Sequence, residues 1–181
     1  KRIEGAEIII TNKTPISKKI IEASKDLKLI CVLATGYDVV DVIEAKAAGV
    51  TVCNVPSYGT DSVAQYSIAL LLEICCHIGH HNDTVQEGVW SKCVDWCYWD
   101  YPLIELAGKT MGIIGFGRIG QAEGKIARAL GMNVIAYDVN CNESGKKLAE
   151  YVDLDALYEK SDVISLHCNL TRDNQQMINK D

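Results

Sequence analysis

Residues 111–120 read Met-Gly-Ile-Ile-Gly-Phe-Gly-Arg-Ile-Gly, an apolar run that passes directly into a Gly-x-Gly-x-x-Gly pattern. Its glycines are Gly115, Gly117 and Gly120. A second apolar run, 134–137, ends in Asp138, about 20 residues beyond the last glycine. The segment between the two runs has the pattern of a helix. Strand, glycine turn, helix, strand and acid in this order predict a βαβ unit.

Each part of this unit has a physical role in binding a dinucleotide. Gly115 permits the tight turn, Gly117 lets the backbone approach a pyrophosphate, and Gly120 lets helix and strand pack closely. The helix N-terminus offers N–H groups and a positive dipole end to the phosphates. Asp138 can accept hydrogen bonds from a ribose hydroxyl. No Arg or Lys occupies the five positions after Asp138, so the sequence predicts NAD rather than NADP as the cofactor.

Composition narrows the class of protein. The 181 residues are 48% hydrophobic and 23% charged, as in an ordinary globular protein. The net charge of −6 gives no reason to expect nucleic acid or an anionic membrane as a partner. No apolar run is long enough to span a bilayer, and no signal peptide is evident. We therefore expect a cytoplasmic protein whose eight cysteines are reduced thiols.

Predicted strands and helices alternate along the chain, which favours parallel sheets with helices on their faces. Strands are predicted at 6–10, 27–33, 50–53, 110–115, 133–137, near 152 and at 162–167. Helices are predicted at 17–24, 39–48, 62–81, 119–130 and 154–159. The fold class is therefore α/β, with an incomplete Rossmann-type doubly wound parallel sheet and part of a second α/β domain.

The chain resembles the D-isomer-specific 2-hydroxyacid dehydrogenases, and within them the glycerate dehydrogenase (hydroxypyruvate reductase) branch. The residues that carry the resemblance, besides the glycine pattern, are Val32–Asp41, Asn54–Pro56, Thr60–Gln65, Trp99–Thr110 and Ser165–His167. The resemblance implies NAD-dependent interconversion of a 2-keto acid, hydroxypyruvate or glyoxylate, and its D-2-hydroxy acid, D-glycerate or glycolate. It also implies a homodimer for the full-length protein.

The resemblance assigns domains as well. Residues 1–55 would form part of a flavodoxin-like substrate-binding domain. Residues 56–181 would form part of the NAD-binding Rossmann domain, with a linking helix at 61–81 and an arm at 82–107.

Several roles follow from the resemblance position by position. The backbone of Thr35 and Gly36 would hold the substrate carboxylate. Arg118 and Ile119 would meet the pyrophosphate beside the three glycines, and Asp138 would bind the ribose. The loop from His167 to Leu170 would pass the cofactor, with His167 and Asn169 as its cofactor-binding residues. Most relatives have proline where this chain has Asn169.

The family's catalytic arginine, acid and histidine match no position of this chain. They would lie downstream of Asp181, and a further strand and helix would precede Lys1. We therefore expect a fragment that is inactive alone. Two alternatives stay open: a non-catalytic NAD(H)-binding module similar to a corepressor, and a phosphoglycerate- or formate-type dehydrogenase of the same family.

Other residues have competing interpretations. His77, His80 and His81, near Cys75 and Cys76, could ligate zinc. A helix face packed on a neighbouring domain or subunit is favoured, because no second ligand pair has zinc spacing, so no metal is predicted.

Two further residues could be mistaken for catalytic groups. A catalytic His167 would need an orienting carboxylate, and none is near in sequence. Arg172 is interpreted as a surface residue. The aromatic stretch 90–101 is interpreted as an arm that packs on another subunit.

Overall fold

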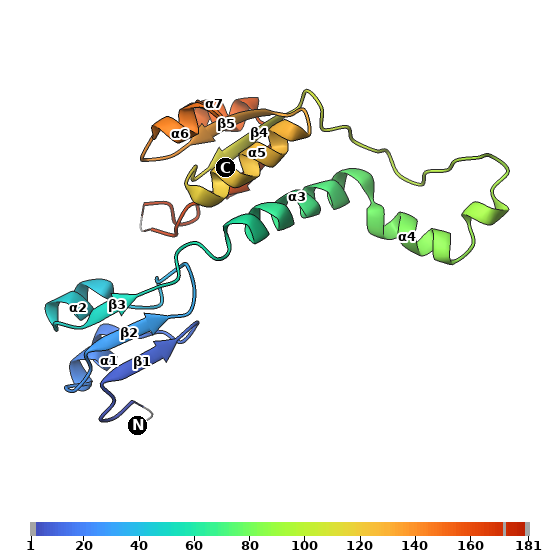
Figure 1. Cartoon of the computed structure of the whole chain (residues 1–181). Coiled ribbons are helices and arrows are strands. Elements are labelled where there is room, and N and C mark those ends of the chain that lie inside the picture. Colours follow the sequence, from blue (N-terminus) through green and yellow to red (C-terminus); the bar gives the residue numbers. More distant parts are fainter. Residues whose placement is uncertain (1–2, 172, 180–181) are drawn as a thin grey trace. The chain divides into compact units, whose positions relative to one another are not determined.

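A computed structural model describes residues 3–171 and 173–179. The chain divides into two compact units, and each is described by itself. One comprises the residues up to Gly59 together with those from Asn169 on, and the other comprises Thr60–Cys168 (Figure 1). The predicted division into domains at residues 55 and 56 stays a prediction.

The first unit is a three-stranded parallel sheet with two short helices. Strands β1 (Ile8–Thr11), β2 (Leu29–Val32) and β3 (Thr51–Cys53) lie in the order β1-β2-β3. Helices α1 (Lys18–Ala23) and α2 (Val42–Ala47) follow the first two strands. The burial of alternate residues on β1 and β2 shows that one sheet face is covered. Its core comprises Ile9, Ile16, Ile21, Leu27, Ile30, Val32, Ala34, Val40, Ala45 and Val50.

The second unit is a four-stranded parallel sheet. Strands β4 (Thr110–Ile114), β5 (Asn133–Tyr137), β6 (Glu150–Tyr151) and β7 (Val163–Leu166) lie in the order β6-β5-β4-β7. Chain order would number these strands 3-2-1-4, as in one half of a doubly wound fold. The predicted Rossmann-type parallel sheet is therefore confirmed.

Helices complete this unit. They are α5 (Arg118–Ala129), α6 (Glu143–Lys146) and α7 (Leu154–Lys160). The long helix α3 (Thr60–Cys76) packs against α5. The core comprises Ile68, Leu71, Cys75, Leu106, Met111, Ile113, Phe116, Ala127, Met132, Val134, Ala136 and Ala149.

The prediction of one continuous helix over 62–81 is wrong. His77 has left-handed backbone angles (φ 49°) and ends α3, and α4 (Ile78–Gln86) begins directly after it. The Glu73 carboxylate accepts a hydrogen bond from the Gly79 backbone N–H at 3.0 Å. This bond satisfies an amide of the new helix that the break would leave unpaired.

The two helices bend by 63° at this break. Among the described residues no single helix is long and apolar enough to cross a membrane, although α3 and α4 taken together meet that test. A short 3-10 helix (Trp90–Lys92) follows α4, and an irregular segment then runs to β4 (Figure 1).

Candidate functional site

The ends of three neighbouring strands place the predicted cofactor residues in one row. Ile114 of β4 lies opposite Tyr137 of β5 and Leu166 of β7 in the sheet register, and the next residues are Gly115, Asp138 and His167. The order of the strands reverses between β4 and β7. Such a switch point, at the carboxyl ends of parallel strands, is where open α/β sheets bind their ligands.

Gly115 is packed so tightly that only glycine fits. Its φ is +90°, and a Cβ built there would lie 2.4 Å from the Cys168 nitrogen and 2.5 Å from the His167 carbonyl carbon. The backbone after β7 therefore packs directly against the glycine turn. A Cβ on Gly120 would lie 2.4 Å from the Gly115 oxygen, so the first turn of α5 is equally close.

Gly117 differs, because its missing side chain leaves open space. It is exposed, and a Cβ there would meet no atom within 4 Å. It is also the N-cap of α5 and has no side chain to cap the first turn, which begins with Arg118 and Ile119. An uncapped helix N-terminus beside open space fits an approaching pyrophosphate.

Asp138 is half-buried at the end of β5. Its Oδ1 accepts a hydrogen bond from the Asn140 backbone N–H at 2.8 Å. This bond orients the carboxylate within the loop that leads to α6, and a carboxylate there can accept from a ribose hydroxyl.

A network that sequence reasoning missed holds this loop against α5. Gln121 Nε2 donates to the Phe116 carbonyl at 2.9 Å, and Ser144 Oγ donates to Gln121 Oε1 at 2.8 Å. Asn142 Oδ1 accepts from the Gly145 N–H at 2.8 Å and lies 2.6 Å from Ser144 Oγ, whose one hydroxyl proton is shared between the two acceptors. Asparagine is favoured at helix N-caps, so the sequence could have indicated the cap that Asn142 forms on the short helix α6. Nothing in the sequence indicates that Gln121 joins the same network.

Tyr151 packs against the same loop. Its ring meets Phe116 edge to face at 5.8 Å, and a Cβ on Gly145 would lie 2.1 Å from its hydroxyl. The hydroxyl is buried without a hydrogen-bond partner among the described residues. Burial raises the pKa of Tyr151 above its ordinary value of 10.0.

This burial predicts a pH-dependent stability. A raised pKa in the folded state means that unfolding releases a proton above about pH 10, so stability is complete below that pH and is lost as pH rises. Tyr151→Phe should remove this alkaline loss, because the variant has no side-chain group that titrates in this range. Urea unfolding of both chains across this pH range measures the effect; an unchanged alkaline slope in the Phe variant would contradict it.

His167 has a carboxylate partner that the sequence did not reveal. Its Nε2 lies 2.6 Å from Glu123 Oε2 and 3.0 Å from Ser165 Oγ, and both ionisable side chains are buried. Glu123 is 44 positions away in sequence, but it shares a helix face with buried Gly120, Gly124 and Ala127. A charged residue on a helix face of otherwise small, apolar residues could have indicated that Glu123 has a buried partner.

Thr35 and Gly36 lie in the first unit, after β2. The Asn54 side chain donates to the Thr35 carbonyl at 2.8 Å, and Thr35 Oγ1 donates to the Val55 carbonyl at 3.1 Å. Asn169 belongs to the same unit, and Arg172 lies outside the described residues. The roles predicted for Thr35, Gly36 and Asn169 stay predictions.

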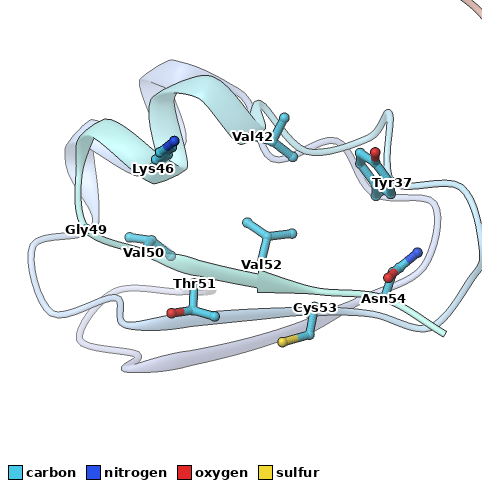
Figure 2. A pocket seen from close by; sticks show the side chains of 9 residues that line it. All are labelled: Tyr37, Val42, Lys46, Gly49, Val50, Thr51, Val52, Cys53 and Asn54. Atoms are coloured by element: carbon cyan, nitrogen blue, oxygen red, sulfur yellow. The ribbon is translucent and has the colours of Figure 1, made fainter. Parts of the chain in front are cut away.

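A hollow of about 510 Å³ adjoins this loop between α2 and β3. Figure 2 shows Val42 of α2 and Val52 of β3 pointing toward one another across it, with Tyr37 and Asn54 at one end. Its lining combines the apolar side chains of Val42, Val50 and Val52 with polar side chains that include Lys46, Thr51 and Asn54.

The histidines near α4 contact aromatic residues of their own chain. His77 and His80 lie 4.6 and 4.9 Å from the Tyr101 ring, measured between centroids. His80 Nε2 lies 2.6 Å from Asp100 Oδ2. Within the part of the chain that the structure describes, no cluster of three or more His, Cys, Asp or Glu side chains could hold a metal ion. All eight cysteines are free thiols.

Comparison with known proteins agrees with this geometry. Residues 68–181 match the model of the D-isomer-specific 2-hydroxyacid dehydrogenase, NAD-binding domain. The chain is 56% identical to a hydroxypyruvate reductase of Blautia hydrogenotrophica, covering 99% of the chain and 56% of that protein. It is 42% identical to a glycerate dehydrogenase of Methylorubrum extorquens, covering 98% and 55%.

Solved structures show the same relationship. A D-lactate dehydrogenase from Aquifex aeolicus, complexed with NAD and lactic acid, matches with a TM-score of 0.86 and 31% identity over 98% of this chain and 53% of that one. The chain thus spans about half the length of the relatives it matches. It belongs to the D-isomer-specific 2-hydroxyacid dehydrogenases and carries the NAD-binding domain of that family.

Proposed function

We propose that the protein is an NAD-dependent oxidoreductase that interconverts hydroxypyruvate or glyoxylate with D-glycerate or glycolate. The observation that carries this proposal is the row of Gly115, Asp138 and His167 beside the open position at Gly117. The substrate class rests on the similarity to a hydroxypyruvate reductase and a glycerate dehydrogenase.

The chain's own residues would bind and orient the reactants. Gly115, Gly117 and the first turn of α5, with Arg118 and Ile119, would hold the pyrophosphate, and Asp138 would accept from the ribose. The backbone of Thr35 and Gly36 would hold the substrate carboxylate. Bound NAD(H) supplies hydride exchange at its nicotinamide ring. The His167 ring is committed to Glu123, so we assign it no proton transfer to substrate.

We further propose that these 181 residues bind NADH without turnover, because the family's catalytic arginine, acid and histidine match no position here. NADH fluorescence should report binding, and added hydroxypyruvate should leave NADH unoxidised. The matched comparison is the same assay on a chain extended to the length of its relatives. Steady oxidation by the 181 residues would refute this proposal, and an extended chain inactive on both hydroxypyruvate and glyoxylate would refute the assigned substrates.

We also propose a homodimer in the cytoplasm. The side chains of Val63, Tyr66, Leu70 and Ile74 repeat along α3, each at least 42% exposed. A contiguous apolar stripe of this kind is typical of protein interfaces, and free thiols fit a reducing compartment. Light scattering should give twice the chain mass, and Leu70→Asp with Ile74→Asp should give the monomer.

A further inference from the structure

Glu123 is a carboxylic acid in a place where a charge is costly. It lies in the second turn of α5, only 1% exposed, about 8 Å along the helix axis from Arg118. A lone negative charge there would reduce the positive potential at the N-terminus of α5 and would repel an incoming pyrophosphate. The other charged residues of this part of the helix, Arg118 and Lys125, are exposed.

His167 is placed to offset this charge. Its side chain is 6% exposed and its Nε2 is 2.6 Å from the Glu123 carboxylate. The backbone N–H of His167 donates a hydrogen bond to the Ile114 carbonyl at 2.7 Å. This bond holds His167 beside the glycine turn. Ser165 Oγ, 3.0 Å from the same ring nitrogen, completes the polar surroundings.

We infer that Glu123 and His167 form a buried pair without net charge, which keeps the N-terminus of α5 attractive to the dinucleotide pyrophosphate. His167 is then a positioning residue that acts on the cofactor through Glu123 rather than by touching it. This inference rests on the proposed binding of the pyrophosphate at Gly117.

The test compares ligands with and without phosphates at about pH 8.5. NMR titration of the full chain measures the affinity for ADP-ribose and for adenosine. His167→Leu leaves Glu123 unpaired. This variant should lower the affinity for ADP-ribose at least about tenfold and should change the affinity for adenosine less than about twofold. The double variant with Glu123→Gln should recover most of the ADP-ribose affinity.

Glu123→Gln alone keeps the size of the side chain and removes its charge. If the pair has no net charge, this variant binds ADP-ribose within about twofold of the parent. A tenfold gain in its ADP-ribose affinity would mean that the pair carries a negative charge. An equal loss of affinity for ADP-ribose and for adenosine in His167→Leu would mean that the pair has a purely structural role. Either result overturns the inference. Gly117→Ala tests the site separately: unchanged ADP-ribose affinity there would refute the proposed pyrophosphate site instead.

Discussion

Gly115→Ala should destabilise the second unit by about 2 to 6 kcal/mol and abolish NADH binding. The left-handed φ of +90° strains any residue with a Cβ by about 1–3 kcal/mol. The new methyl would also lie 2.4 Å from the Cys168 nitrogen, which is backbone and cannot rotate away, and overpacking of this kind costs about 1–3 kcal/mol. Urea unfolding followed by circular dichroism measures the loss of stability.

Gly117→Ala is the matched control, two residues along the same motif. Its φ of −78° suits alanine, and its Cβ would meet no atom within 4 Å. Stability should therefore change by less than about 0.5 kcal/mol. NADH affinity should still fall at least about tenfold, because the methyl fills the space left for the pyrophosphate. Equal stability of the two variants would show that the packing at Gly115 has been misjudged.

The sequence was most informative where local pattern and topology coincide. The apolar runs at 110–115, 133–137 and 162–167 predicted parallel strands, and parallel strands bring their carboxyl ends to one edge. The register then aligns the ends of these strands in one row. The glycine spacing predicted close packing, and the contact of Gly115 with the backbone of His167 and Cys168 supplies its cause.

The features that the sequence did not predict arise from interactions between residues that are distant in sequence or from local backbone geometry. The apolar positions of α3 keep a helical period up to the break, so periodicity gave no sign that His77 adopts a left-handed conformation. The pairing of Glu123 with His167 and of Gln121 with Ser144 depends on how α5 packs against its neighbours. No short-range pattern encodes such pairs, although a charge on a buried helix face indicates that a partner exists.

Asp138→Ala should weaken NADH binding about 10- to 100-fold and reduce the preference for NADH over NADPH. Hydrogen bonds to a charged group contribute about 1.5–3 kcal/mol, and the variant loses the acceptor for the ribose. It also removes the negative charge that a 2′-phosphate would meet. Fluorescence titration with both cofactors gives the ratio of the two dissociation constants.

Two further variants separate the charge of Asp138 from its geometry. Asp138→Asn retains an oxygen that can accept from the Asn140 N–H, 2.8 Å from Oδ1 in the parent, so the loop should keep its shape while tolerance of NADPH rises. Val139→Ala alters a neighbour that is 83% exposed and should leave both affinities unchanged. Because the Gln121 network fixes the same loop, Gln121→Ala should lower the preference for NADH with Asp138 intact. If Asp138→Ala keeps the preference for NADH, another residue must bind the ribose.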